Sequence, residues 1–283
     1  MRLCVLGSSS SGNSTYLELG NSRFLIDAGL SARVIEQRLA MLNVAVADLD
    51  AIFITHEHTD HINGLKVLAG RNPVPVYCTR HTALEIESIL KITPEFYIFS
   101  SGEPFKFDDV VIEPFSVFHD AQDPVGFCFH YNGKKIGFAS DLGYVTTFVK
   151  RQLQNCDALL IESNHDVNML IADQKRPWSV KQRIKGRQGH LSNEHACELI
   201  AEIAHPGLRH VVLVHLSQDC NRPDMAYKRM AQTLDSLGLD TAKVHLSYPH
   251  KPSEQIPLDT CRIELNSTAV CYAGDQLEIP MVL

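Results

Sequence analysis

The chain has 283 residues, of which 45% are hydrophobic and 21% charged, the composition of an ordinary globular protein. Its net charge of −7 argues only weakly against a nucleic-acid partner, because bulk charge says little about one cleft. The eight cysteines form no C-x-x-C pair, so we expect buried free thiols rather than disulfides or a thiolate zinc site. We find neither a signal peptide nor a stretch near the roughly 20 apolar residues of a membrane span, which predicts a cytoplasmic protein.

Strands and helices alternate in the first part of the chain. The expected elements are strands at 2–6, 15–19 and 23–27, a helix at about 32–42, a strand at 50–55, a short helix ending near 68, a strand at 74–78 and a helix at 82–90. Ser31 is the expected N-cap of the first helix, because its hydroxyl can accept a hydrogen bond from a free backbone N–H.

The middle of the chain is rich in strands, and a second alternating part follows it. The expected elements are strands at 96–99, 104–107, 110–118, 125–131 and 134–139, a helix near 147–154, a strand at 158–162, a helix at 192–204, a strand at 210–215 and a helix at 223–237. Asn132-Gly133 is a tight hairpin signal.

Blocks of strands with helices outside each indicate an α/β fold in which two sheets face each other between helical layers, a four-layer αββα sandwich. No linker, repeat or low-complexity tract divides the chain. We therefore expect a single domain over residues 1–283, with residues 250–283 as a C-terminal extension whose elements the pattern does not place.

The most informative stretch is Thr-His-Glu-His-Thr-Asp-His at residues 55–61, directly after an apolar run. Imidazole and carboxylate are the ligands that hold zinc, manganese or iron at hydrolytic centres. His56 and His58 are two residues apart, so an extended chain points both the same way. Asp60 and His61 fall where the chain turns into a helix. One segment can therefore serve two adjacent metal ions, as phosphoryl displacement requires, whereas a solvated histidine-rich loop does not account for this order.

Three further candidate ligands stand where predicted strands end, which is where α/β folds place their sites. They are His119, Asp141 and His215. A single histidine of this kind is more often a hydrogen-bonded core residue, but three together with the heptapeptide indicate a metal site.

The ligand order H-x-H-x-D-H, His, Asp, His resembles that of the metallo-β-lactamase-fold hydrolases, over essentially the whole chain. Within that superfamily the chain is most similar to the WalJ/YycJ group of DNA exonucleases. The stretches that carry this resemblance are residues 6–13, 118–120, 140–143, 162–166, 189–193 and 215–217. One departure is the run Gln-Asp-Cys-Asn at 218–221, where the group tends to show paired asparagines.

The resemblance implies two divalent metal ions that share Asp141 as a bridging ligand. His56, His58 and His119 would complete the first site, and Asp60, His61 and His215 the second. Asp60 and Asp141 therefore also count as catalytic, since two ions held in this way keep a bridging hydroxide between them. This set of histidines and aspartates does not choose between zinc and manganese.

Residues beyond the ligands carry weaker signals. By comparison with RNase Z-like relatives, His190 would pair with Glu162 and protonate the leaving group; the alternative is a loop-capping histidine and a surface glutamate. His165 matches the group pattern, either as a substrate contact or through loop packing. Asp120 and Asp166 are expected to orient neighbouring histidines.

Two loops complete the predicted site. The serine-rich loop at residues 8–13 is expected to be a structural turn near the metals, with phosphate contact as the weaker option. Residues 175–187 contain six basic side chains, no acidic one, and Trp178. We expect Lys181, Arg183 and Lys185 to contact DNA there, whereas the alternative is a solvated helix face with the tryptophan in the core.

These features predict a dinuclear metal-dependent phosphodiesterase, specifically a DNA exonuclease. The main alternative keeps the fold but hydrolyses a small ester, thioester or cyclic phosphodiester. A third possibility is a non-catalytic, metal-stabilised module that binds nucleic acid. The complete set of metal ligands, with room left for a water molecule, argues against it.

Overall fold

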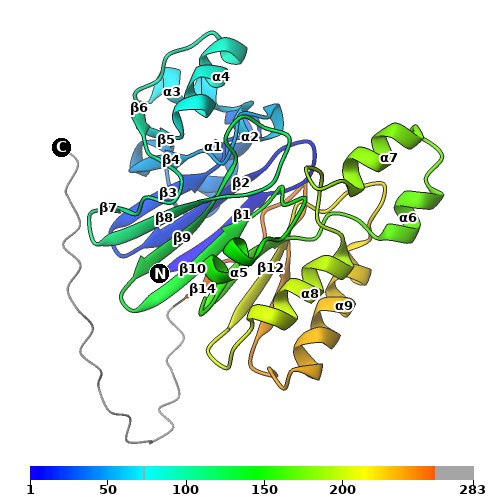
Figure 1. Ribbon diagram of the computed structural model, residues 1–283. Helices are drawn as coiled ribbons and strands as arrows, with labels where there is room; N and C mark the ends of the chain where they lie inside the picture. The colour runs from blue at the N-terminus through cyan, green and yellow to red at the C-terminus, as the bar shows by residue number, and fades with distance from the viewer. Residues whose placement is uncertain (73, 259–283) are drawn as a thin grey trace, which may run out of the picture.

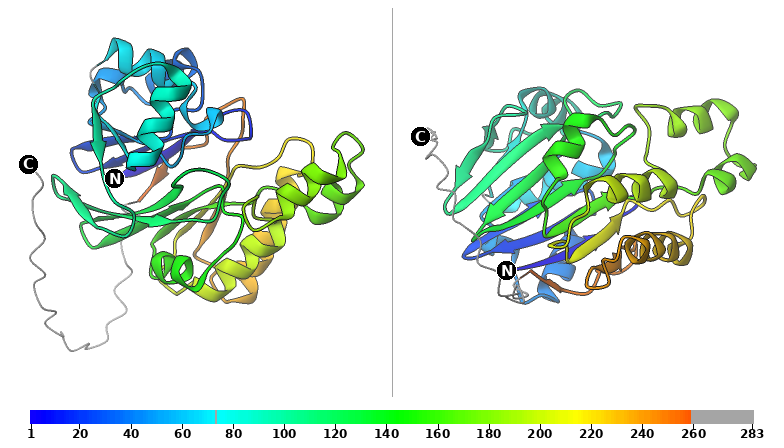
Figure 2. Two further views of the ribbon diagram at one scale, coloured as in Figure 1. Left: turned by 45° about the horizontal axis from the view of Figure 1, so that its top comes forward. Right: turned by 60° about the horizontal axis from the view of Figure 1, so that its bottom comes forward.

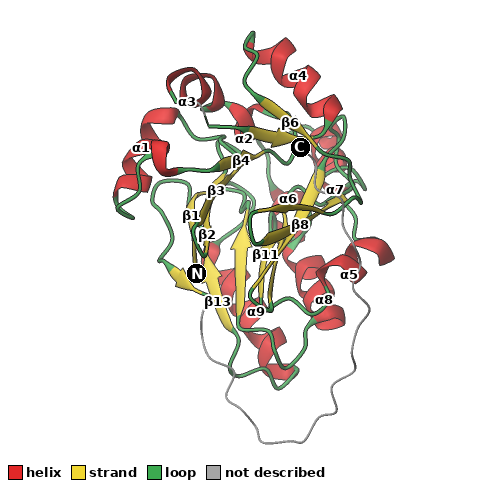
Figure 3. Cartoon of the chain, turned by 90° about the vertical axis from the view of Figure 1, so that its left-hand side faces the viewer, coloured by secondary structure: helices red, strands yellow, loops and turns green. Residues whose placement is uncertain are grey.

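The computed structural model describes residues 1–72 and 74–258. Two seven-stranded sheets pack face to face, and helices cover the outer face of each (Figures 1 and 3). This arrangement is the predicted four-layer αββα sandwich.

The first sheet has the strand order β14-β1-β2-β3-β4-β5-β6. Its strands are β1 (Arg2–Gly7), β2 (Ser14–Leu19), β3 (Ser22–Ile26), β4 (Ala51–Phe53), β5 (Val76–Cys78), β6 (Phe96–Ile98) and β14 (Ile256–Pro257). The helices inserted between them are α1 (Ala32–Ala40), the 3₁₀ turn η1 (Val46–Asp48), α2 (Thr59–Ile62), α3 (Leu65–Arg71) and α4 (Arg80–Leu90). Strands β3 to β6 run parallel, so their carboxyl ends meet at one edge.

The second sheet has the order β13-β12-β11-β10-β9-β8-β7. Its strands are β7 (Phe105–Phe107), β8 (Val110–Ser116), β9 (Val125–Tyr131), β10 (Lys134–Ala139), β11 (Ala158–Glu162), β12 (His210–Val214) and β13 (Lys243–Leu246). Its covering helices are α5 (Thr147–Leu153), α8 (Asn193–Ile203) and α9 (Pro223–Ser236). Asn132 and Gly133 both have positive φ, as the predicted tight hairpin between β9 and β10 requires.

Three apolar layers hold the sandwich together. The central layer lies between the sheets and is dominated by aromatic rings, among them Phe24 and Phe53, whose centroids are 5.2 Å apart in an edge-on pair. The outer layers bury α1, α3 and α4 against the first sheet and α5, α8 and α9 against the second. Each fully buried phenylalanine or leucine contributes about 1.5–3 kcal/mol relative to an exposed one.

Helix α1 illustrates how the sequence sets a local element. The Ser31 hydroxyl accepts a hydrogen bond from the Val34 N–H, as predicted. Ile35 and Leu39 are fully buried on the inner face. The helix ends at Ala40, and Leu42 is buried just beyond it.

Two short helices that the periodicity does not predict project from the side of the sandwich. They are α6 (Val167–Ala172) and α7 (Trp178–Lys185), and both further views show them standing clear of the sheets (Figure 2). We call this pair the α6–α7 projection. Strand β13 is a further element absent from the sequence prediction.

The C-terminal part adds one element to the first sheet. Residues 256 and 257 form β14, which pairs antiparallel with β1. Residues 259–283, most of the predicted extension, lie outside the described residues, so a single domain over the whole chain stays a prediction.

The described cysteines fit the expected free thiols. All six are buried and unpaired within residues 1–72 and 74–258, whereas Cys261 and Cys271 lie outside these ranges. Within the same ranges we find no helix long and apolar enough to cross a membrane.

Candidate metal centre

Segments that follow four different strands converge at one cleft at the carboxyl edge of the sheets. The heptapeptide follows β4, His119 follows β8, and Asp141 and His215 follow β10 and β12. The cleft has a volume of about 180 Å³, and its lining residues are Ser10, His58, Asp60, His119, Asp120, Asp141, Val180, Arg183, Ile184, Gly189, His190 and His215. The structure thus brings the predicted ligands together from sites far apart in the chain.

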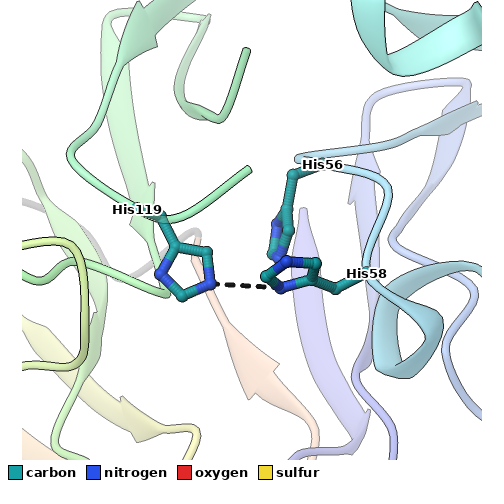
Figure 4. A group of neighbouring side chains, drawn as sticks. All are labelled: His56, His58 and His119. Atoms are coloured by element: carbon teal, nitrogen blue, oxygen red, sulfur yellow. Dashed lines mark hydrogen bonds between the residues drawn. The ribbon is translucent and has the colours of Figure 1, made fainter. Parts of the chain in front are cut away.

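Four overlapping groups of described residues have ligand atoms within 4.8 Å of one another, and two of these groups correspond to the two predicted sites. The first contains His56, His58 and His119, with His119 Nε2 3.2 Å from His58 Nδ1 (Figure 4). The second contains Asp60, His61 and His215, and both rings place Nε2 3.5 Å from Asp60 Oδ2. Two further groups cross this division, namely His56, His61 and Asp141, and Asp141, Glu162, His190 and His215. The division of the ligands between two metal ions therefore stays a prediction.

Asp141 lies between the two groups. Its Oδ1 is 3.7 Å from His119 Nε2, and its Oδ2 is 3.2 Å from His61 Nε2. The residue is buried and has φ +52°, a left-handed conformation that non-glycine residues adopt at a cost and that often marks functional sites. The backbone bend after β10 therefore directs one carboxylate toward both groups.

Buried carboxylates hold two of the rings in place. Asp27 Oδ2 accepts a hydrogen bond from His61 Nδ1 at 2.8 Å, and Glu162 Oε1 accepts one from His215 Nδ1 at the same distance. An Nδ1–H donor leaves Nε2 unprotonated on a neutral imidazole, which is the form that binds a metal. Both Nε2 atoms lie 3.5 Å from Oδ2 of Asp60, which lines the cleft.

Neutral acceptors hold two more rings in the same way. The Thr55 hydroxyl donates to Asp27, which leaves its oxygen as the acceptor for His56 Nδ1 at 2.9 Å. The Gly189 carbonyl accepts from His119 Nδ1 at 3.1 Å. His56 and His119 therefore also present Nε2 to the cleft.

The unpaired atoms of the cleft test whether these residues fit a metal. His56 Nε2, His215 Nε2 and Asp141 Oδ2 are fully buried and have no hydrogen-bond partner within the described ranges. Leaving such atoms unpaired costs about 1–3 kcal/mol each. Two divalent cations, one beside His56 and one beside His215, would satisfy all three atoms, so the donor set fits metal ions.

The electrostatics agree with that fit. Burial opposes charge on His61, but Asp27 and Asp141 outweigh it and raise the pKa of His61 well above its usual value. Burial also opposes ionisation of Asp60, yet His61 and His215 lower the pKa of Asp60. The cleft thus holds an excess of buried negative charge that only cations, protons or metal ions, can balance.

His190 and Glu162 form the predicted pair. Glu162 Oε1 accepts a hydrogen bond from His190 Nδ1 at 2.9 Å, and its Oε2 accepts from the Leu142 and Leu191 N–H groups. Burial alone would raise the pKa of Glu162, but His190 and His215 lower it to about 2. The alternative, a surface glutamate at a strand end, is wrong because Glu162 is fully buried.

The serine-rich loop is a structural turn beside the ligands. The Ser8 hydroxyl accepts a hydrogen bond from the His215 N–H at 2.7 Å. The Asn13 amide donates to Asp60 Oδ2 at 3.2 Å. A Cβ on Gly29 would lie 1.6 Å from the Asp60 carbonyl oxygen, so only glycine permits this close approach.

His165 lies outside the cleft. Its side chain is buried, its backbone pairs with Ser192 and Asn193, and burial lowers its pKa to about 4. The structure therefore favours loop packing over substrate contact. Asp166 caps helix α6 by accepting from the Met169 N–H and does not orient a histidine.

Lys181 is buried rather than free to contact DNA. Its ammonium donates to the carbonyl oxygens of Ile171 and Asp173 at the end of α6, so its predicted place in substrate binding is corrected to a structural one. Arg183 does reach the cleft, where its guanidinium pairs with Asp120 Oδ2 at 2.5 Å. Trp178 is 60% exposed, so it is not the core residue of the alternative reading.

Sequence reasoning missed two residues of the site. Asp27 and Thr55 carry no ligand role, but together they orient His56 and His61. The available signal was an aspartate directly after a buried strand, the same pattern that revealed Asp141.

Residues 22–216 match the family described as the beta-lactamase superfamily domain. The chain is also 35% identical to exodeoxyribonuclease YycJ of Bacillus anthracis, over 90% of this chain and 98% of that protein. The chain belongs to the metallo-β-lactamase superfamily and to its YycJ/WalJ family. Exodeoxyribonuclease WalJ of Streptococcus pneumoniae is 38% identical over 90% of this chain and 96% of its own length.

Solved structures share the superfamily fold. The metallo-beta-lactamase fold protein YhfI of Bacillus subtilis superposes with a TM-score of 0.67 at 18% identity, covering 89% of this chain and 97% of YhfI. Zn²⁺-bound PqqB of Methylobacterium extorquens has a TM-score of 0.65 at 17% identity, with coverage of 91% and 100%. At these identities the similarity establishes the fold alone.

Proposed function

We propose that this YycJ/WalJ family member is a metal-dependent exodeoxyribonuclease. The observation that supports the proposal is the 35–38% identity over 90% of the chain to proteins named exodeoxyribonuclease, combined with the clustering of the predicted ligands in groups that could hold a metal. DNA is the proposed substrate, and the cytoplasm, where DNA is accessible, is the proposed location.

Two divalent ions, zinc or manganese, are proposed to occupy the cleft. One ion would be held by His56, His58 and His119. The other ion would be held by Asp60, His61 and His215, and Asp141 would lie between the two ions. When bound, such ions supply Lewis-acid stabilisation of a phosphoryl group and lower the pKa of a coordinated water.

The remaining chemistry belongs to side chains of the cleft. His190 lines the cleft, and Glu162, which accepts from its Nδ1, fixes the ring so that Nε2 can face substrate. Burial lowers the pKa of His190, but Glu162 outweighs that effect and raises it, which favours the protonated ring. His190 is therefore the proposed acid that protonates the departing oxygen, a role commonly worth about 10²–10⁴ in rate.

DNA would approach past the α6–α7 projection. Arg183 is at the cleft, and Lys185 and Arg187 line the hollows beyond it. Arginine and lysine side chains at these positions can contact successive phosphates of a DNA strand. This basic surface would allow DNA to bind here although the chain as a whole has a net charge of −7. Trp178 adds an exposed ring farther out on α7.

The test is degradation of end-labelled linear DNA by metal-loaded protein, with covalently closed circular DNA beside it. An exonuclease releases nucleotides from the linear ends and leaves the circle intact. Asp141→Asn should abolish the products because it removes the shared charge while keeping the shape of the buried residue. Equal cutting of circular DNA would contradict the exonuclease proposal.

The same assay also tests the alternative function, hydrolysis of a small ester, thioester or cyclic phosphodiester. If wild-type protein degrades no DNA with either zinc or manganese but rapidly hydrolyses a thioester or a cyclic dinucleotide, the alternative is correct. Arg183→Gln and Lys185→Gln should weaken DNA binding and reduce its salt dependence, whereas hydrolysis of a small phosphodiester should stay within a few-fold.

A further inference from the structure

A second hollow, of about 440 Å³, adjoins the metal cleft. Its lining residues are Phe118, Asp120, Arg183, Gly186, Arg187 and Gln188. It shares Asp120 and Arg183 with the metal cleft, so the ion pair between these two residues stands where the two cavities meet. Its volume is within the range of about 300–1,000 Å³ that is usual for small-molecule sites.

Two exposed aromatic rings lie at and beside this hollow: Phe118 lines it, whereas Tyr144 lines a neighbouring hollow that shares Arg187 with it. Phe118 is 47% exposed and Tyr144 is 43% exposed, and their ring centroids are 6.2 Å apart in an edge-on arrangement. The Arg187 guanidinium lies over the Tyr144 ring, 4.7 Å from its centroid. Single exposed apolar residues need no explanation, but two neighbouring aromatic rings and a stacked arginine where two hollows meet form a surface suited to a planar ligand.

Backbone contacts hold the parts of this surface together. The Gly143 N–H donates to the Phe118 carbonyl at 2.9 Å, which places Tyr144 beside Phe118. A Cβ on Gly143 would come within 2.5 Å of the Arg187 carbonyl oxygen, so the two backbones are in direct contact. The aromatic surface is therefore preformed and does not depend on ligand to assemble.

The charge of the hollow indicates the class of ligand. Arg187 has no carboxylate partner within residues 1–72 and 74–258, and its positive charge remains available to a phosphate. Arg183, although paired with Asp120, is 68% exposed in its side chain. A ligand that is planar, stacks, and carries phosphate on the side of the metal cleft is a nucleotide within a nucleic-acid strand.

We propose that this hollow is a base-stacking subsite, where Phe118 and Tyr144 receive the nucleobase next to the phosphate under attack while Arg187 contacts its backbone. The proposal rests on the proposed nuclease function and adds the position of the neighbouring base. Stacking uses the face that every base has, so the subsite is tolerant of sequence. A base stacked on protein has left its own helix, so the subsite favours an unpaired DNA end over a fully paired one.

The test compares DNA binding with and without the base. Metal-loaded protein is titrated with a fluorescein-labelled, cleavage-resistant phosphorothioate oligodeoxythymidylate and with the same strand carrying abasic residues at its last three positions, each labelled at the opposite end. For wild-type protein the abasic strand should bind more weakly by about 5- to 150-fold, the loss expected for one stacked base. Tyr144→Ala should lose the same factor on the full strand and lose little more on the abasic one.

Matched variants separate stacking from a loss of fold. Tyr144→Phe keeps the ring and should keep the base dependence. Tyr227→Ala removes an equally exposed tyrosine, 43%, from helix α9 outside the hollow and should behave as wild type. Thermal melting of each variant shows whether it is folded, and the abasic comparison within one folded variant does not depend on the amount of active protein.

The outcomes distinguish this proposal from the function on which it rests. If wild-type protein degrades DNA but binds abasic and full strands equally, the base-stacking subsite is wrong and the nuclease function stands. If no DNA is bound or degraded, the proposed function fails first. If Tyr144→Ala instead converts a dimer to a monomer without changing base dependence, the aromatic surface is a contact between copies of the chain.

Discussion

Asp27 and His61 form a fully buried pair in which the carboxylate accepts the ring Nδ1–H at 2.8 Å. Asp27 reaches this position with φ +60°, directly after β3, and the same carboxylate accepts the Thr55 N–H. It therefore couples the end of β3 to the heptapeptide that follows β4. The pair fixes His61 with its Nε2 toward the cleft before any metal arrives.

Asp27→Asn should lower metal affinity about 10- to 100-fold, the usual effect of losing a residue that orients a ligand. The amide keeps the volume of the carboxylate but holds the His61 ring less firmly and with less charge. Competition with a chromogenic chelator measures the change. The matched control is Asp157→Asn, which alters a carboxylate that also accepts a backbone N–H but lies at β10 and β11. Unchanged metal affinity in Asp27→Asn would show that the pair serves only the fold.

His190→Ala should lower the rate on DNA by about 10²–10⁴ while leaving metal content unchanged, because the ring donates a proton and is not among the predicted ligands. A substrate whose leaving group needs no proton isolates that role. With the 4-nitrophenyl ester of thymidine 5′-phosphate, the variant should retain most of the wild-type rate. If both substrates slow by the same factor, His190 positions substrate or supports the cleft instead of acting as an acid.

The metal ligands could be predicted from the sequence because each of them lies in a segment that directly follows a recognisable apolar strand. The heptapeptide follows a buried strand, and His119, Asp141 and His215 each stand just after a strand whose apolar run is easy to recognise. The parallel strands of a sheet then bring such residues to one edge. The order of strands and helices along the chain also predicted that the two sheets pack face to face.

The parts that escaped prediction depend on contacts between distant segments. Asp27 acts through His61, 34 positions along the chain, and no local pattern records that distance. Helices α6 and α7 have six and eight residues, too few for a helical period to be convincing. Lys181 belongs to a basic run, and only the fold shows that its ammonium is buried.

Lys181→Met should destabilise the α6–α7 projection rather than remove a DNA contact. Its ammonium satisfies two carbonyl oxygens at the end of α6, and losing such partners costs about 1–3 kcal/mol. Hydrogen exchange should therefore become faster in α6 and α7 specifically. Lys185→Met is the control, since it removes the same charge from the last turn of α7 without unpairing these carbonyls. Loss of DNA binding with unchanged exchange in Lys181→Met would restore the original prediction.

His210 should make the protein less stable in mild acid. Burial lowers the pKa of His210 from 6.5 to about 4, and His245 adds to this effect because its Nε2 lies 3.0 Å from His210 Nδ1. Between these two values the unfolded chain binds a proton that the folded protein does not, so the free energy of unfolding falls as pH decreases through the window. Urea denaturation at several pH values from 7.5 to about 4.5 measures this slope.

His210→Gln should flatten that slope, because glutamine can still donate to His245 Nε2 but does not titrate. The other titrating groups contribute equally to both proteins, so the difference between the two curves isolates His210. The matched control is His81→Gln, at a histidine whose side chain is 66% exposed. If His210→Gln and wild type lose stability in parallel from pH 6.5 to 4.5, the acid sensitivity arises elsewhere, and the carboxylate-rich cleft becomes the first place to look.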